Sequence, residues 1–249
     1  MRKLLRGMII YFFVLVVPLV CTASICTAQV PKMIALTFDD GPTPEYTERI
    51  LDILKQKGIK ATFFVTGKNA STYPDVVRKI VADGHVIGNH SYSHANFQRL
   101  TDEQVFNEIL GTQQVIYQIT GHSPKFVRYP LGFETPAAQK ATRELGLTGS
   151  VGWHWGQDVH DDDWMCKGVD PTLRFTKSAT QDGAILLVHD ANEVTRCPDQ
   201  LAWLGQYIDW ARQHGFIFGL LRTAEAPNKI NMNTWVNVVP DSQAQRWNE

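Results

Sequence analysis

The chain has 249 residues, of which 44% are hydrophobic and 20% are charged, which is enough apolar material for the core of one large domain. Lysine and arginine together number 24, against 25 aspartates and glutamates, so the chain lacks the basic excess of a nucleic-acid-binding protein. The same fractions exclude a disordered, collagen-like or polytopic membrane protein.

The first 28 residues are typical of a cleavable export signal. A basic start at Arg2 and Lys3 precedes an apolar run from Met8 to Val20, and small residues follow up to Ala28. An uncleaved anchor is the alternative, but the run is shorter than the ~20 residues that span a bilayer. We therefore expect an exported protein, periplasmic or secreted, that keeps no membrane span after cleavage behind Ala28 or Ala23.

Hydrophobic runs of strand length then alternate with amphipathic stretches of helix length. The pattern predicts strands at 33–38, 61–65, 85–88, 125–128, 147–155, 184–189 and 216–221. It predicts helices at 45–57, 73–82, 101–120, 135–145, 171–180 and 198–214, the third opened by a capping box from Thr101 to Gln104. This alternation favours a single-domain α/β fold with a parallel sheet, most simply a distorted (β/α)7 barrel. A doubly wound open sheet would give a similar pattern.

The domain should occupy residues 29–225, and the polar residues 226–249 should form an irregular tail with a short strand at 234–239. Cys166 and Cys197 are the cysteines left after leader cleavage, and in an oxidising compartment they favour one disulfide. Two buried thiols are the alternative. We expect a monomer.

Polar residues recur where predicted strands end, which is where parallel α/β proteins place their working residues. They are Asp39 and Asp40 after the first strand, His90 and His94 after the third, Arg128 after the fourth and His189 at the end of the sixth. His85, His122, His154 and His214 have no partner pattern and are expected to be structural.

Two histidines and an aspartate form a three-ligand set that leaves a position for water, as in hydrolytic zinc sites. His90 and His94 are spaced one helical turn apart, so both could reach one ion, although such a pair alone is more often a coincidence. Adjacent side chains at a strand end point different ways, so Asp40 can bind a metal while Asp39 accepts a proton. A solvated turn, or Asp40 capping the next helix, is the alternative.

Arg128 could orient and tune Asp39 or merely pair with a surface carboxylate. His189 ends an apolar strand, so a buried structural histidine competes there with a catalytic one.

At these residues the sequence resembles the NodB-like polysaccharide deacetylases, carbohydrate esterase family four. The resemblance runs from about Lys32 to Leu221 with the motifs in the family's order. The matching segments are Thr37-Phe-Asp-Asp-Gly41, His90-Ser-Tyr-Ser-His94, Arg128-Tyr-Pro130 and Leu187-Val-His189, with Leu131 where the family often has an aromatic residue.

The resemblance implies a role for each matching residue. Asp40, His90 and His94 would hold a divalent metal, usually zinc, although such donors also accept cobalt or nickel. Asp39 would be the general base, oriented by Arg128, and His189 the general acid. The backbone N–H of Tyr129 would stabilise the oxyanion, and Trp164 and Leu187 would line the acetyl pocket.

The fourth motif departs from the family pattern. The family has an aspartate, two residues and then Asp-Trp; here Asp163-Trp164 is present, but His160 stands where the first aspartate belongs. Counting forward from Trp155 favours Asp158 as the residue that orients His189, with Asp161 as the fallback.

The function implied is a hydrolase that removes acetyl groups from an N-acetylated, or less readily an O-acetylated, polysaccharide. It would act on carbon–nitrogen bonds other than peptide bonds, and its partner would be peptidoglycan, a chitooligosaccharide or a similar polymer. The alternatives are a NodB-like amidase for a small linear or cyclic amide and a non-catalytic, metal-containing glycan-binding protein.

Overall fold

The computed structural model describes residues 31–154, 156–157, 162–191, 197, 201–223 and 236–240. The leader expected at 1–28 lies outside these residues. The described residues belong to one compact unit. Among the helices of the described part, none has the length and apolar character needed to cross a bilayer.

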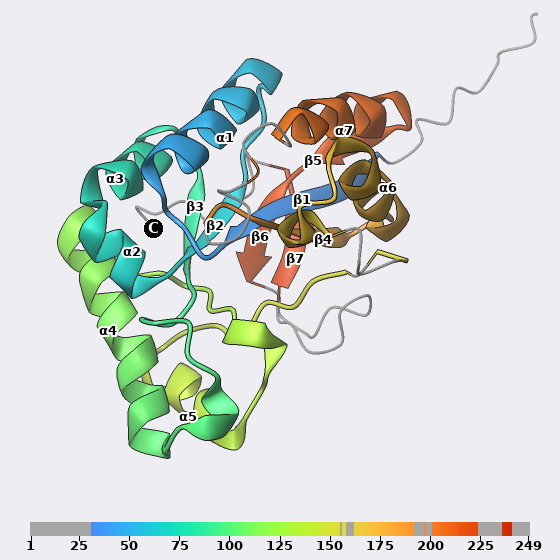
Figure 1. Ribbon diagram of the computed structural model, residues 1–249. Coiled ribbons are helices and arrows are strands. Elements are labelled where there is room, and N and C mark those ends of the chain that lie inside the picture. The colour runs from blue at the N-terminus through green and yellow to red at the C-terminus, as the bar shows by residue number, and fades with distance from the viewer. Residues whose placement is uncertain are drawn as a thin grey trace, which may run out of the picture. The chain divides into compact units, whose positions relative to one another are not determined.

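Strand β1 (Lys32–Asp39) organises the parallel sheet shown in Figure 1. It pairs with β2 (Thr62–Val65) on one side and with β4 (Ala184–His189) on the other, and β5 (Phe216–Phe218) pairs with its first residues. Strand β3 (Val86–Asn89) lies beyond β2. Because Asp39 is opposite both Phe64 and His189 in register, the carboxyl ends of these strands meet at one edge.

Single bridges continue this sheet between β3 and β4. Val127 bridges to Asn89 and to Ser150, and His154 bridges to Leu186, all in the parallel sense. The strands predicted at 125–128 and 147–155 are therefore reduced to isolated bridges, although their order around the sheet is that of a distorted (β/α)7 barrel. The α/β class is confirmed.

The helices follow the strands much as the sequence pattern predicts. They are α1 (Pro44–Lys57), α2 (Gly67–Thr72), α3 (Pro74–Ala82), α4 (Asp102–Thr120), α5 (Pro136–Glu144), α6 (Val169–Ala179) and α7 (Ala202–Gln213). Short 3-10 turns are η1 (Phe97–Arg99), η2 (Pro130–Gly132) and η4 (Asp163–Met165). The capping box at Thr101 is present, whereas the sequence analysis missed α2, which is too short to show helical periodicity.

Side chains of β1 alternate between two environments. Ile34, Leu36 and Phe38 are buried in the large cluster that also takes in apolar residues of α1, α3 and α7. Ala35 belongs to a second cluster, with Phe64 and residues of the other strands. Because strand side chains alternate with a period of two, Thr37 and Asp39 follow Ala35 on its side, toward the second cluster.

Two of the histidines that were expected to be structural accept backbone N–H groups of the sheet. His85 Nδ1 accepts the N–H of Ala61 at 3.1 Å, and His154 Nδ1 accepts the N–H of Ile185 at 3.0 Å. His85 is fully buried, and burial lowers the pKa of its imidazole to about 3.

The C-terminal part adds a two-stranded antiparallel sheet, in which β6 (Leu220–Thr223) pairs with β7 (Val236–Val239). The strand expected within 234–239 is thus present. Cys166 and Cys197 form the expected disulfide, with their Cα atoms 6.0 Å apart.

Candidate active site

The two adjacent aspartates at the end of β1 both lie near His90, whose Nε2 is 3.6 Å from Asp39 Oδ2, but they differ in their other partners. Asp39 is the last strand residue and meets Arg128, whose Nη1 lies 2.7 Å from its Oδ1. Asp40 adopts a left-handed conformation, with φ 76°, and its Oδ1 lies 3.3 Å from the Nε2 atoms of both His90 and His94. The helix-cap alternative for Asp40 is wrong, because the N-cap of α1 is Thr43 and no side chain caps it.

A loop, rather than the helical turn considered from the spacing, brings His90 and His94 together. The segment after β3 is not helical, and Ser91 and His94 both have φ near 60° (60° and 59°). Local hydrogen bonds hold the loop: Ser91 N–H donates to Asn89 Oδ1 at 2.9 Å, and His94 N–H donates to Ser91 Oγ at 3.1 Å. The Glu108 carboxylate on α4 accepts the two N–H groups that follow Ser91.

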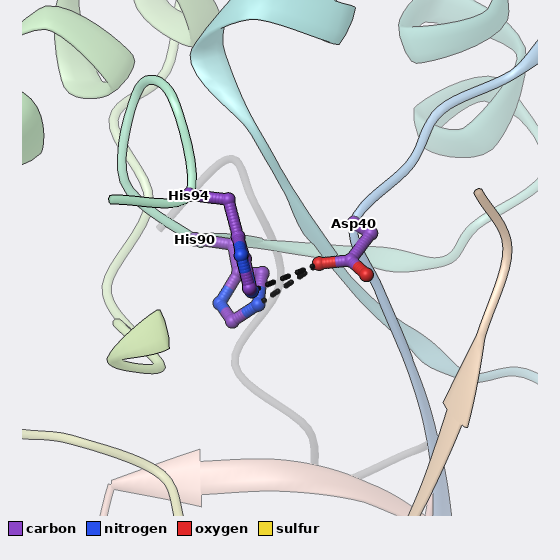
Figure 2. Close-up of side chains that lie close together, drawn as sticks. All are labelled: Asp40, His90 and His94. Atoms are coloured by element: carbon purple, nitrogen blue, oxygen red, sulfur yellow. Dashed lines mark ion pairs between the residues drawn. The ribbon is translucent and has the colours of Figure 1, made fainter. Parts of the chain in front are cut away.

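Asp40, His90 and His94 fit a divalent cation by donor type and by spacing. Figure 2 shows both imidazoles turned toward one carboxylate oxygen of Asp40. The three donor atoms lie within 4.8 Å of one another. Tetrahedral zinc with bonds of ~2.0–2.1 Å would place two ligand atoms about 3.4 Å apart, close to the separations between Asp40 and each histidine.

The tautomer of His90 also suits a metal ligand. Its Nδ1 lies 2.8 Å from the backbone oxygen of Arg128, and because a carbonyl only accepts, Nδ1 carries the hydrogen. In the neutral ring, Nε2 therefore presents its lone pair toward Asp40.

Charges in this cluster favour ionised Asp40. Burial opposes its charged form, but the hydrogen bond and charge of His90, together with the charges of His189 and His94, outweigh burial and lower the pKa of the carboxyl group. Burial likewise opposes protonation of His90, yet Asp39 and Asp40 raise the pKa of that imidazole.

Arg128 is completely buried, and it donates hydrogen bonds to other groups of the sheet as well as to Asp39. Its Nη1 also donates to Thr37 Oγ1 at 2.7 Å, and its Nε donates to the carbonyl of Val151 at 2.9 Å. The guanidinium lies over the Phe64 ring, 4.3 Å from the ring centroid. The surface-carboxylate alternative for Arg128 is therefore wrong.

His189 is held by Asp163. Its Nδ1 lies 2.7 Å from Asp163 Oδ1, and its backbone N–H donates to Asp163 Oδ2, also at 2.7 Å. Burial opposes protonation of the imidazole, but Asp163, followed by Asp40 and Asp39, raises its pKa to about 10. Asp163 thus takes the place that the sequence analysis gave to Asp158, which, like the fallback Asp161, lies outside the described residues.

One cavity of about 310 Å³ brings these groups together. Tyr129, Trp164 and Leu187 line it together with both aspartates at the end of β1, the two histidines near Asp40, and His189. Trp164 and Leu131 are largely exposed at 45% and 56%. The cavity lining consists of Asp39, Asp40, His90, His94, Tyr129, Leu131, Trp153, Asp162, Trp164, Leu187, His189 and Ala191.

Sequence reasoning missed Asp162, Asp163 and Trp153 as site residues. Asp163 carried a signal, because it immediately precedes Trp164 in the Asp-Trp pair of the fourth motif. Trp153, whose ring centroid is 5.5 Å from the Arg128 guanidinium carbon, carried none, since its segment has little regular strand structure to set its direction.

Comparisons with known proteins agree with this geometry. The sequence profile of the polysaccharide deacetylase family matches residues 27–150. A peptidoglycan-N-acetylglucosamine deacetylase of Bacillus cereus is 48% identical over 156 residues, which cover 63% of this chain and 55% of that protein. A chitooligosaccharide deacetylase of Bradyrhizobium is 34% identical over 172 residues, covering 68% of this chain and 76% of that one.

A solved structure shows the same fold. The family 4 carbohydrate esterase from Streptomyces lividans, in complex with acetate, superposes with a TM-score of 0.69 at 30% identity, covering 84% of this chain and 98% of that one. The chain therefore belongs to the polysaccharide deacetylase family, the NodB-like proteins of carbohydrate esterase family four. It spans about half the length of the Bacillus cereus relative.

Proposed function

We propose that this protein is a metal-dependent deacetylase of N-acetylated polysaccharides. The observation that carries the proposal is that one cavity is lined by the clustered Asp40, His90 and His94 and also by Asp39 and His189. A carboxylate base and an imidazole acid around one cation site are the groups that hydrolysis of an amide requires.

Each residue has a distinct task in this mechanism. A divalent cation held by Asp40, His90 and His94 would polarise the acetyl carbonyl and acidify a water molecule. Asp39 takes the proton from the attacking water, and Arg128 holds its carboxylate in place. His189 protonates the nitrogen of the leaving amine. The raised pKa of its imidazole favours this step, because the ring is then protonated at neutral pH.

Tyr129 and the apolar lining would act on the acetyl group itself. The backbone N–H of Tyr129 is our candidate donor to the developing oxyanion, where one such contact is typically worth ~3–4 kcal/mol. Trp164 and Leu187 would exclude water around the methyl group. Zinc is the expected metal, although cobalt and nickel suit the same donors.

The substrate we propose first is the N-acetylglucosamine of peptidoglycan, followed by chitooligosaccharides, because the relatives above are named for these activities. Both substrates are consistent with export of a monomeric protein after removal of the leader. An acetate-release screen of metal-stripped and zinc-restored enzyme on peptidoglycan, chitooligosaccharides and acetylated xylan tests the proposal. Zinc-dependent release from a glucosamine polymer is expected, and no release from any of these polymers would contradict it.

The described site gives less support to the alternatives. A non-catalytic glycan-binding protein would need neither base nor acid, yet Asp39 and His189 each have a buried partner that orients them. A small-amide hydrolase would release no acetate in the screen.

A further inference from the structure

Asp190 is a buried carboxylate beside His189 that the proposed chemistry does not use. It is only 1% exposed. Its Oδ1 accepts the N–H of Gly41 at 2.9 Å, and its Oδ2 accepts the hydroxyl of Thr47 at 2.7 Å. Gly41 directly follows Asp40, and Asp190 directly follows His189. This carboxylate therefore joins the carboxyl ends of β1 and β4, which carry the proposed metal ligand and the proposed acid.

The peptide group between Asp40 and Gly41 is held at both ends. Its carbonyl oxygen accepts Asn69 Nδ2 at 2.8 Å and Thr66 Oγ1 at 3.3 Å, and its N–H is the one that donates to Asp190. Asp40 has φ 76°, a conformation that residues with a Cβ adopt rarely and keep only where the surroundings impose it. The Asp190 carboxylate is one of the contacts that impose it.

The fit between Asp190 and Gly41 leaves no room for a side chain. A Cβ built on Gly41 would lie 2.2–2.4 Å from three atoms of the Asp190 carboxylate group. The backbone adds a second link, because Asp190 N–H donates to the carbonyl of Asp39 at 3.0 Å. The position of this carboxylate is thus fixed relative to both catalytic aspartates.

We propose that Asp190 is a positioning residue: its carboxylate fixes the turn at Asp40 so that the metal ligand and the acid keep their separation. The inference rests on the proposed function, and it assigns Asp190 no contact with substrate. Groups that orient metal ligands typically change metal affinity or activity by about 10- to 100-fold when removed. A buried carboxylate that only supported the fold would change stability and leave metal affinity untouched.

The test compares Asp190→Ala with Asp190→Asn and with the matched control Thr47→Val. Thr47→Val removes a buried hydrogen bond to the same carboxylate but leaves Gly41 bound. The readouts are Co²⁺ affinity of metal-stripped protein by visible absorption, kcat and KM on an N-acetylated chitooligosaccharide, and Tm. We expect Asp190→Ala to weaken Co²⁺ binding and lower kcat by about 10- to 100-fold each. Asp190→Asn should restore most of both, because its amide oxygen can accept the Gly41 N–H.

Thr47→Val should lower Tm and keep Co²⁺ affinity. If Asp190→Ala binds Co²⁺ like the wild type, or loses no more affinity than Thr47→Val, the positioning role is wrong. Should Asp190→Ala fail to fold, Gly41→Ala displaces the carboxylate in a different way, and wild-type Co²⁺ affinity in that variant would overturn the inference. If the wild-type protein releases no acetate, the proposed function is wrong. If the wild type is active and Asp190→Ala has the same activity and Co²⁺ affinity, only this inference is wrong.

Discussion

Nη1 of the Arg128 guanidinium lies 2.7 Å from Oδ1 of the Asp39 carboxylate, and Arg128 is fully buried while Asp39 is only 3% exposed. A buried ion pair of this kind is costly to break, because the remaining charge keeps its desolvation penalty and loses its partner. The contact therefore couples the orientation of the proposed base to the stability of the fold.

Arg128→Met should therefore destabilise the protein. It leaves the Asp39 carboxylate without its counter-ion, and losing one member of a buried pair typically costs about 3–5 kcal/mol. Urea denaturation followed by circular dichroism measures the change. The control is Arg78→Met, which breaks only an exposed contact with Asp75 and should shift the free energy of unfolding by less than about 1 kcal/mol. Equal shifts for the two variants would contradict the structural role of Arg128.

Asp39→Asn should remove turnover while leaving the proposed metal site occupied. An amide cannot take the proton of the attacking water, and general-base catalysis typically contributes about 10²- to 10⁴-fold to the rate. Acetate release measures the loss, and the zinc content of the purified variant measures metal retention. Activity equal to wild type would remove Asp39 from the role of base.

Asp163→Asn should move the alkaline limb of the pH profile to lower pH. Asp163 is the main group that raises the pKa of His189 to about 10, so without its charge this pKa falls toward the ordinary value of about 6.5. The imidazole must be protonated to act as the acid, so activity is then lost at a lower pH as the pH rises. The measurement is kcat/KM from pH 5 to 10; an unmoved alkaline limb would mean that another group is the acid.

Chelation should abolish activity reversibly. Asp40, His90 and His94 are the proposed three-ligand set, of the kind found in hydrolytic zinc sites, so metal-stripped protein should regain acetate release with Zn²⁺ or Co²⁺. His94→Ala should need more metal than wild type for half-maximal activity. Full activity of the stripped protein, with residual metal excluded by mass spectrometry, would contradict metal dependence.

Loss of the disulfide should lower stability. Cys166 and Cys197 are 31 residues apart, and closing a loop of this length stabilises a fold by about 3–4 kcal/mol in the chain-entropy model. The double variant Cys166→Ser/Cys197→Ser should show this loss in urea denaturation, compared with wild type before and after reduction. If the urea midpoint of the wild-type protein does not change on reduction, the disulfide does not stabilise the fold and this prediction is wrong.

The sequence predicted those features that have a local signature. A hydrophobic run of strand length located β1, and the capping box placed the start of α4. The proposed metal ligands could be predicted because Asp40, His90 and His94 follow strand ends, which a parallel sheet brings to one edge.

Long-range pairings were harder to predict. Asp163 reaches His189 across 26 residues from a 3-10 turn that has no regular periodicity, and counting from Trp155 selected Asp158 instead, although the Asp-Trp pair marked Asp163. The spacing of His90 and His94 fits a helix, but the segment forms a loop in which Ser91 and His94 have positive φ angles. Hydrogen bonds to Asn89 and Glu108 hold this loop, and the spacing alone does not reveal them.

The imidazole of His85, which accepts a backbone N–H inside the sheet, also makes the fold sensitive to acid. Its pKa is about 3 in the folded protein and near 6.5 once the chain is unfolded, so the unfolded chain binds this proton first as the pH falls. The free energy of unfolding is unaffected by this group above pH 6.5 and decreases progressively between pH 6.5 and 3. An acidifying environment would therefore destabilise the sheet at His85, directly before β3, the strand that leads to His90, and a His85→Gln variant should stay folded at lower pH.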